Sequence, residues 1–391
     1  MKVVIIGGGF GGVQAALSLD RAGGFDVRLV SNKPYFEYHA ALYRSATGRS
    51  PLEVAIPLAD IFRETDVEVL EDRIERIDAE AKTVTGKSGS VYRYDALVVA
   101  VGTVTSYFGI AGLAENSLGI KTIHEALELR RHIHDQALSG TAEHYVVVGA
   151  GMTGIEVAGE IGAYVARIQS SHGLPDARCS VDLVEAGSRI LPAMPEPYAR
   201  RVHDRLEELG VSIRTDTRVE AETYSSLQLP DGTISSHVVV WTAGSTTHPL
   251  VGAHPSLFRL DAKGRVLVNE RLEASPGIYV VGDSASTPFS GMAQTALHDA
   301  RFVAVVLRAA SEGKQPPRYE PKRPLYALPV GPGWAAVLIG SYSFFGRIGW
   351  ILRRLADFRL YLAFVPLLEA IRLWRYGRTR QEGCAVCTLH A

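Results

Sequence analysis

The sequence predicts an α/β fold made of two doubly wound domains and a C-terminal amphipathic helical segment. Two stretches carry the same design: near residues 2–19 and again near residues 145–168, a β-branched run leads into a glycine-rich turn and then a helical pattern. Short apolar runs alternate with helical patterns along the rest of the chain, which is typical of parallel sheets covered by helices. A basic, aromatic stretch near the C-terminus predicts the remaining segment.

The composition excludes several classes of protein. With 391 residues, of which 47% are hydrophobic and 21% are charged, the chain is long and apolar enough for two or three folded domains. It has 41 basic and 42 acidic residues, and a net charge of −1 argues against a general nucleic-acid binder. Three cysteines exclude a disulfide scaffold and indicate a reducing compartment.

No targeting or membrane-spanning segment is expected. The first strand-like run, Val3 to Ile6, begins too close to Met1 to leave room for a signal peptide. No run of about 18 uncharged apolar residues occurs, so no transmembrane helix is expected. The nearest candidate, Leu360–Leu368, is short and contains a proline.

The first glycine-rich turn predicts a dinucleotide site. Gly7, Gly9 and Gly12 form a G-x-G-x-x-G pattern directly after a strand and at the start of a helix. The first glycine permits the tight turn, the second lets the backbone approach a pyrophosphate, and the third lets the helix pack close to the strand. The helix N-terminus then offers N–H groups and a positive dipole end to the phosphates.

The other elements follow in order along the chain. A continuous apolar run between turns predicts a strand buried on both faces. Such runs occupy residues 27–30, 96–101, 181–184, 238–241 and 278–281, helical patterns occupy 123–138 and 198–209, and residues 310–333 are predicted to connect the domains to the C-terminal segment.

The second glycine-rich turn, 142 residues after the first, indicates a duplicated Rossmann-like domain. Gly149, Gly151 and Gly154 repeat the pattern, and the next strand ends in Glu185. An acid there accepts hydrogen bonds from a ribose 2′-OH and repels a 2′-phosphate, so this site should prefer NAD(H) over NADP(H). The alternative is a solvated glutamate at a strand end. The first unit has Ser31 in place of the acid, and a serine would bind a ribose more weakly.

Two dinucleotide sites in one chain predict an internal electron relay, with a tightly held flavin in the first unit and a passing nicotinamide in the second. Two other strand ends fit contacts to a flavin. One ends in a turn at Gly102, and another ends at Gly282 and Asp283, whose carboxylate suits a ribityl hydroxyl. The alternative role of Asp283 is that of a helix N-cap.

At this point the sequence resembles the type II NADH dehydrogenases, which are non-proton-pumping NADH:quinone oxidoreductases within the pyridine nucleotide-disulfide oxidoreductase-like superfamily of flavoproteins. The resemblance extends from residue 2 to about residue 308 and continues loosely to the C-terminus. The segments that carry it are residues 7–12, 94–109, 149–160, 184–192, 241–244, 281–283 and 293–298.

The resemblance implies an NAD domain inserted in an FAD domain. The implied bounds are 1–115 and 246–330 for the FAD domain, 116–245 for the NADH domain and 331–391 for the C-terminal membrane-associated segment. The implied FAD contacts are Gly7, Gly9, Phe10, Gly11, Gly12, Ser31, Ile74, Ala100, Gly102, Gly282, Asp283 and Ala293. The implied NADH contacts are Gly149, Gly151, Met152, Thr153, Gly154, Glu185, Ala243 and Gly244.

Three residues are candidates for catalysis. Glu156 follows the second glycine-rich turn, and we expect it in the first turn of the next helix. It is predicted to lie near the junction of the nicotinamide and the flavin. The alternative is a glutamate favoured there only by the helix dipole. Gln294 and His298 are four residues apart, share a helix face and are predicted to contact the quinone. The alternatives are a helix-capping Gln294 and a His298 that is an ordinary surface residue.

His298 departs from the family pattern Ala-Gln-x-Ala-x-Gln, which has glutamine in this position. A histidine still hydrogen-bonds a quinone carbonyl and can carry a proton.

The cysteines exclude two related classes. A flavin disulfide reductase needs a redox cysteine pair near the flavin, and sulfide:quinone oxidoreductases need separated cysteines for attack on sulfur. Cys179, Cys384 and Cys387 fit neither placement. The C-x-x-C pair near the C-terminus lacks a second ligand pair, so no metal site is predicted. The pair is interpreted as a reactive or disordered tail, with a redox or metal role as the alternative.

The C-terminal segment predicts attachment to a membrane surface. Residues 344–380 hold eight arginines against Asp357 and Glu369, a net charge of +6, and eight aromatic residues are interleaved with them. Arginine on one side and Trp, Phe and Leu on the other describe an interfacial helix that would meet anionic head groups. Pro366 should kink or divide this helix. The alternative is a dimerisation or core helix, and a homodimer is expected.

These observations predict a peripheral enzyme of the respiratory electron-transport chain on the cytoplasmic face of the cell membrane. As the resemblance implies, it would pass a hydride from NADH to FAD and two electrons to a membrane quinone, without proton pumping. The alternatives are a related NADH:acceptor or quinone reductase with a non-respiratory role, and a membrane-associated redox sensor.

Overall fold

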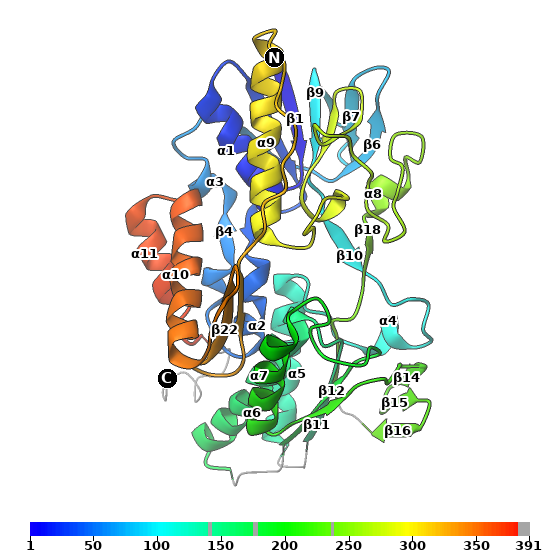
Figure 1. Ribbon diagram of the computed structural model, residues 1–391, viewed down its shortest axis with the longest axis vertical. Coiled ribbons are helices and arrows are strands. Elements are labelled where there is room, and N and C mark those ends of the chain that lie inside the picture. The colour runs from blue at the N-terminus through cyan, green and yellow to red at the C-terminus, as the bar shows by residue number, and fades with distance from the viewer. Residues whose placement is uncertain (140–142, 175–178, 236–237, 382–391) are drawn as a thin grey trace. The chain divides into compact units, whose positions relative to one another are not determined.

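The computed structural model describes residues 1–139, 143–174, 179–235 and 238–381 (Figure 1). The chain forms two compact units, each assembled from separate stretches of sequence. Unit 1 comprises Met1–Tyr38, Ala55–Val104 and Ser245–Pro324, and unit 2 comprises His39–Val54, Thr105–Gly244 and the chain from Leu325 onward. The bounds predicted for the FAD domain, the NADH domain and the C-terminal segment are not tested by this division and stay predictions.

Unit 1 is built on a six-stranded sheet in the order β19-β20-β9-β1-β2-β5. All neighbours pair in parallel except β19, which is antiparallel to β20. The central strand β1 is almost entirely apolar and Val3 to Ile6 are buried, as expected for a strand covered on both faces. The strands are β1 (Lys2–Ile6), β2 (Asp26–Ser31), β5 (Glu68–Glu71), β9 (Ala96–Val99), β19 (Glu273–Ser275) and β20 (Ile278–Val280).

Two long helices of unit 1, α1 (Phe10–Ala22) and α9 (Ala293–Ser311), lie side by side (Figure 1). An antiparallel sheet of β6 (Ile74–Asp78), β7 (Thr83–Gly86) and β8 (Val91–Arg93) also belongs to this unit. Its smaller elements are β3 (Tyr35–Glu37), β4 (Ala55–Pro57), α3 (Leu58–Ile61), α8 (Pro249–Gly252) and the 3₁₀ turn η3 (Gly282–Ser284). Where the chain passes between the units, β10 (Thr103–Thr105) pairs with β18 (Ser245–Thr247).

Unit 2 contains a four-stranded parallel sheet in the order β13-β12-β11-β17. Its strands are β11 (Glu143–Val148), β12 (Cys179–Val184), β13 (Val211–Arg214) and β17 (Val238–Trp241). The helices α5 (Ile123–Leu138), α6 (Met152–Ser171) and α7 (Glu196–Glu208) alternate with these strands along the chain. A short helix α4 (Leu113–Asn116) and a three-stranded sheet of β14 (Ala221–Thr223), β15 (Ser226–Leu229) and β16 (Gly232–Ser235) complete this part.

The last part of unit 2 joins the C-terminal residues to an early stretch of the chain. An antiparallel sheet of β21 (Tyr326–Pro329), β22 (Ala335–Ile339) and β23 (Tyr342–Phe344) packs against α10 (Gly346–Phe364), which is followed by α11 (Leu367–Tyr376). The early stretch contributes η1 (His39–Ala41), α2 (Leu42–Ala46) and η2 (Pro51–Glu53).

Most of the predicted elements are confirmed. Both glycine turns stand between a strand and a helix, and the predicted helix over 123–138 is observed at those bounds. The prediction for Pro366 is also confirmed, because α10 ends before it and α11 begins directly after it. No helix in the described part of the chain is both long and apolar enough to cross a membrane.

Candidate functional site: two glycine turns, a buried ionic network and an apolar face

The first glycine turn has the geometry that a pyrophosphate requires. Gly7 adopts φ +109°, and a side chain there would place Cβ 2.5 Å from the carbonyl oxygen of Ala100. At Gly12 a Cβ would lie 1.8 Å from the carbonyl oxygen of Gly7, so only glycine permits this approach of helix to turn. Gly9, by contrast, faces open space, because a Cβ there would meet no atom within 4 Å. The turn therefore leaves a cradle at its second glycine and at the N-terminus of α1.

The second glycine turn repeats this geometry in unit 2. Gly149 has φ +104°, and a Cβ there would clash with Ala243 at 2.8 Å. At Gly154 it would lie 1.9 Å from the carbonyl oxygen of Gly149, whereas Gly151 again faces open space. Met152 and Thr153 are the first two residues of α6, so their N–H groups lie in the helix turn that has no intrahelical acceptors. Both turns fit the phosphates of a dinucleotide.

Glu185 supports the second turn directly. Its carboxylate accepts hydrogen bonds from the N–H of Ala150 at 2.8 Å and from the N–H of Gly187 at 2.7 Å. Each carboxylate oxygen can accept a further hydrogen bond, as the predicted ribose contact requires. Gly244, another predicted NADH contact, passes close to Ser106, because a Cβ on Gly244 would lie 2.6 Å from the Ser106 carbonyl oxygen.

The structure constrains the predicted role of Ser31. Its buried hydroxyl donates to the carbonyl of Lys33 at 2.8 Å and accepts from the N–H of Lys33 at 3.2 Å. A ribose at this position would have to donate its hydrogen to Ser31. Ile74, another predicted FAD contact, is buried in the hydrophobic core of unit 1 and begins β6, so its contact with FAD stays a prediction.

The remaining predicted FAD contacts belong to unit 1 and cluster at the carboxyl ends of its central strands. Ala100 and Gly102 follow β9, and Gly282 and Asp283 form the turn η3 after β20. Gly11 follows Phe10 at the start of α1, and a Cβ placed on Gly11 would lie 3.0 Å from the Val281 side chain. Ligands in open α/β sheets bind at carboxyl strand ends of this kind.

Ala293, Gln294 and His298 lie on α9, so the shared helix face predicted for the last two is confirmed. The N-cap of α9 is Met292 without a side-chain cap, so Gln294 is not a capping residue, and neither is Asp283. Gln294 is exposed, and His298 is half-buried with Nε2 2.8 Å from the carbonyl oxygen of Glu320.

Glu156 differs from the expectation in one respect. Helix α6 begins at Met152 and its first turn contains no acid, so Glu156 lies beyond the first turn. The helix dipole therefore does not account for it. Its side chain is buried, and burial raises the pKa of Glu156 to about 8, although Arg353 and Arg44 act to lower it.

The arginines near Glu156 belong to a buried ionic network within unit 2. Arg44 contacts Glu53 at 2.5 Å and Asp357 at 2.7 Å, and both carboxylates are fully buried. Two further arginines of α10 complete the network: Arg353 pairs with Asp357 at 2.6 Å, and Arg354 pairs with Glu53 at 3.0 Å. The Tyr361 hydroxyl also donates to Glu53, at 3.2 Å. Three guanidinium groups face two carboxylates, which leaves one excess positive charge.

This network corrects the expected orientation of the C-terminal arginines. Arg353 and Arg354 do not face outward toward head groups, because their acidic partners Glu53 and Asp357 hold them inside unit 2. The outward side of α10 and α11 carries apolar residues instead. These are Ile348, Ile351, Leu355, Leu362, Leu367, Leu368 and Ile371, with Leu368 82% exposed; we call them the apolar face. Arg347, Arg359, Arg372, Arg375 and Arg378 are exposed.

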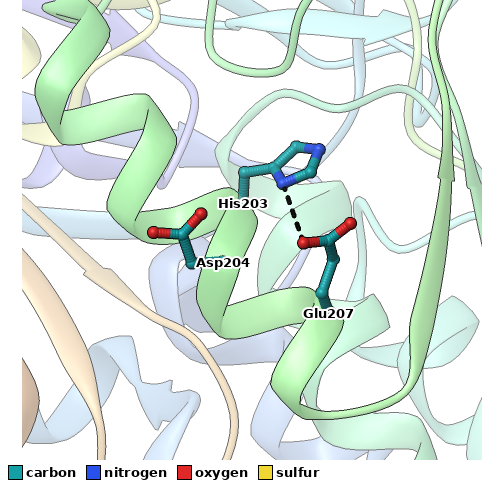
Figure 2. A group of neighbouring side chains, drawn as sticks. All are labelled: His203, Asp204 and Glu207. Atoms are coloured by element: carbon teal, nitrogen blue, oxygen red, sulfur yellow. Dashed lines mark ion pairs between the residues drawn. The ribbon is translucent and has the colours of Figure 1, made fainter.

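One group of metal-ligating side chains occurs among the described residues. His203, Asp204 and Glu207 lie on α7, and Figure 2 shows His203 directed at Glu207, 3.5 Å from Nδ1 to Oε2. The three residues are partly or fully exposed on one helix, and Asp204 also lies 3.9 Å from Arg201. They are surface ion pairs. Of the cysteines, Cys179 begins β12, and Cys384 and Cys387 lie outside the described residues.

The sequence did not single out the network residues Arg44 and Glu53, or Asp299 and Tyr319 of unit 1. Arg44 and Glu53 meet partners on α10 about 300 residues later, and Tyr319 meets Asp299 from an irregular segment. The local signal in the described sequence is Asp299, an acid on a largely apolar face of α9.

Comparison with known proteins agrees with this geometry. The family model of the pyridine nucleotide-disulphide oxidoreductases matches residues 1–300. The type II NADH:quinone oxidoreductase NdhA of Mycobacterium tuberculosis is 32% identical over 90% of this chain and 81% of its own length. The type II NADH:quinone oxidoreductase of Staphylococcus aureus is 26% identical over 82% of this chain and 85% of its own length.

Two solved structures share the fold. The structure of NDH2 from Plasmodium falciparum in complex with NADH covers 97% of both chains with a TM-score of 0.85 at 17% identity. The sulfide:quinone oxidoreductase of Aquifex aeolicus covers 96% of this chain and 92% of its own, with a TM-score of 0.81 at 19% identity. The predicted fold class is thus confirmed. The chain belongs to the pyridine nucleotide-disulphide oxidoreductase family and, within it, to the type II NADH:quinone oxidoreductases.

Proposed function

We propose that this chain oxidises NADH and reduces a quinone, with FAD held in unit 1 and NADH in unit 2, and that it pumps no protons. The observation that carries the proposal is the pair of glycine turns, each closed at its first and third glycine and open at its second. Such a turn accepts a pyrophosphate at a helix N-terminus, and two of them serve two dinucleotides. Family membership selects FAD and NADH as those dinucleotides.

Bound FAD supplies the chemistry that this chain lacks, since it accepts a hydride and passes two electrons to a quinone. The residues of the chain bind and orient the reactants. The N–H groups at the starts of α1 and α6 would hold the phosphates, and the Glu185 carboxylate would accept from a ribose hydroxyl while repelling a 2′-phosphate. NADH is therefore preferred to NADPH.

Quinone reduction also consumes two protons, and we propose that Glu156 and His298 handle them. Glu156 is buried among arginines, and its raised pKa of about 8 keeps a proton on the carboxyl at neutral pH. The Nε2 of His298 lies against a carbonyl oxygen, which only accepts, so this nitrogen carries the hydrogen and Nδ1 is the basic one. Gln294, one turn earlier on α9, would hydrogen-bond the quinone.

An anaerobic titration tests the reaction. NADH should bleach the flavin absorbance band rapidly, NADPH should do so much more slowly, and menaquinone or ubiquinone analogues should restore it. Slow bleaching by NADH contradicts the proposal and would favour a redox sensor. Fast bleaching without reoxidation by either quinone would favour a reductase for another acceptor.

We propose further that the apolar face attaches the enzyme peripherally to an anionic lipid surface, at the cytoplasmic face of the cell membrane. Seven apolar side chains point outward from two consecutive helices, and exposed arginines flank them. Burial in the interface would remove these side chains from water, and the arginines would meet anionic head groups.

Liposome flotation tests this attachment. Leu355→Glu and Leu368→Glu should each weaken binding to vesicles with anionic lipid, because each places a charge on the apolar face. Tyr224→Glu is the matched control, since Tyr224 is 93% exposed on a different part of unit 2. Equal binding by all three variants contradicts the assignment. A wild-type particle of twice the chain mass that is lost in the Leu355 variant would instead assign the face to a homodimer.

A further inference from the structure

Asp299 of α9 is a buried acid for which the proposed reaction gives no role. The side chain is 0% exposed, and its neighbours Ala296, Ala300 and Val303 on the same helix are also buried. Removing a carboxylate from water is costly unless hydrogen bonds replace its hydration, whereas an apolar residue would fit this helix face without that cost. The hydrogen bonds that Asp299 accepts therefore indicate its role.

The carboxylate holds two groups from different parts of unit 1. Oδ2 accepts a hydrogen bond from the N–H of Gly282 at 3.1 Å, and Oδ1 accepts one from the hydroxyl of Tyr319 at 2.5 Å. Gly282 has φ +71° and begins the turn η3 at the carboxyl end of β20. A Cβ on Gly282 would lie 3.1 Å from the Cβ of Ala296, so the turn sits directly on α9.

The turn held by Asp299 is the centre of the predicted FAD contacts. The Ser284 hydroxyl, at its end, donates to the carbonyl oxygen of Gly102 at 2.9 Å. Val281, just before it, packs against Gly11 at the start of α1. A shift of this turn would displace Asp283 relative to two other segments that are expected to contact the flavin.

Tyr319 holds the other carboxylate oxygen of Asp299, Oδ1, and is itself fixed by its neighbours; we call it the clamp. Its N–H donates to the carbonyl of Glu270 at 2.8 Å, and its ring packs against Phe302 with centroids 5.2 Å apart. Burial and the hydrogen bond to Asp299 raise the pKa of Tyr319, so its hydroxyl stays a donor. The His298 ring lies 5.5 Å from the same tyrosine ring, which links the clamp to a predicted quinone contact.

We propose that Asp299 is a positioning residue for FAD: together with Tyr319, it fixes the Gly282–Ser284 turn, which is expected to contact bound FAD. This inference rests on the proposed function, because it requires FAD in unit 1. Without the carboxylate, the N–H of Gly282 loses its acceptor and the turn is free to tilt. A tilted turn holds FAD less tightly and alters the hydrogen-bonding groups presented to it.

Three variants of the holoenzyme test the proposal, with two readouts besides activity: the rate of FAD release on dilution, followed by flavin fluorescence, and the midpoint potential of the bound flavin. Asp299→Leu should release FAD at least tenfold faster and shift the potential. Asp299→Asn should stay within threefold of wild type, because its amide oxygen still accepts from Gly282 and its NH₂ group donates to the Tyr319 oxygen. Tyr319→Phe keeps the ring and should give an intermediate rate.

Asp182→Leu is the matched control, because Asp182 is a buried acid of β12 in unit 2 that is 5% exposed and pairs with Arg214 at 2.9 Å. It should lower the melting temperature without changing FAD release. Equal acceleration in the control would reduce the effect to general stability and overturn the proposal.

Wild-type release and potential in both Asp299→Leu and Tyr319→Phe would also overturn it. Should Asp299→Leu fail to fold, Tyr319→Phe decides: faster release than in Asp299→Asn supports the clamp, and the wild-type rate refutes it. A wild-type protein that binds no FAD would overturn the proposed function itself, whereas FAD binding that is insensitive to these variants overturns only the role of Asp299.

Discussion

Replacing Asp357 with asparagine should destabilise the protein more than any surface substitution on the same unit. The Asp357 carboxylate is fully buried and lies 2.7 Å from Arg44 and 2.6 Å from Arg353. Its loss leaves Glu53 as the one acid of the network facing three guanidinium groups, so the excess charge rises from one to two. Breaking a buried ion pair by removing one partner costs about 3–5 kcal/mol.

Thermal unfolding measures this cost. At about 1.2 °C per kcal/mol for a chain of 391 residues, the melting temperature should fall by about 4–6 °C. Asp204→Asn is the control, because Asp204 is 45% exposed and 3.9 Å from Arg201, and surface changes of this kind stay within about 0.5 kcal/mol. A fall of less than about 2 °C for Asp357→Asn would refute the reasoning, given the cost expected for an unpaired buried charge.

A paired replacement separates charge from packing. Arg44→Met combined with Asp357→Leu removes one charge of each sign, and apolar replacement of buried ion pairs is often neutral. The double variant should therefore be more stable than Asp357→Asn alone. A double variant that is no more stable than the single one would assign the loss to packing.

Three further predictions concern the two nucleotide sites and the protons. Between about pH 5 and 8 the folded protein keeps a proton on Glu156 that the unfolded chain releases, so this group makes the free energy of unfolding fall as pH rises across that window. Glu156→Gln should remove this pH dependence from melting curves. The same variant should slow turnover and leave the flavin content unchanged. Gly12→Ala, whose Cβ meets the Gly7 carbonyl at 1.8 Å, should abolish FAD binding, whereas Gly154→Ala, at 1.9 Å from the Gly149 carbonyl, should leave FAD bound and abolish its reduction by NADH; the reverse pattern in absorbance spectra would exchange the two sites. His298→Ala should raise the KM for quinone more than the KM for NADH, and equal changes in steady-state kinetics would argue against its contact with quinone.

Features that depend on neighbouring residues could be predicted from the sequence. Each glycine turn is set by a few consecutive residues, and the clashes at Gly7, Gly12, Gly149 and Gly154 give the steric reason for the pattern. The break at Pro366 is equally local, because a proline removes one helix hydrogen bond and clashes with the preceding turn.

Features that depend on distant partners could not be predicted in this way. Arg354 belongs to the basic C-terminal segment, yet it is buried because Glu53, about 300 residues earlier, supplies a countercharge. The sequence likewise does not show that His39–Val54 packs in unit 2. The pairing of Asp299 with Tyr319 joins a helix to an irregular segment, where periodicity carries no information.

The inward-facing arginines of α10 have a practical consequence for preparing a detergent-free form of the protein. Deleting the chain from α10 onward would remove Asp357 from Arg44 and Arg354 from Glu53, and would expose the surface on which α10 packs. Such a truncated protein would aggregate through its new surface as readily as through the one that was removed. Retaining both helices and exchanging Ile351, Leu355 and Leu368 for glutamine or lysine keeps the ionic interior intact and changes only the outer surface.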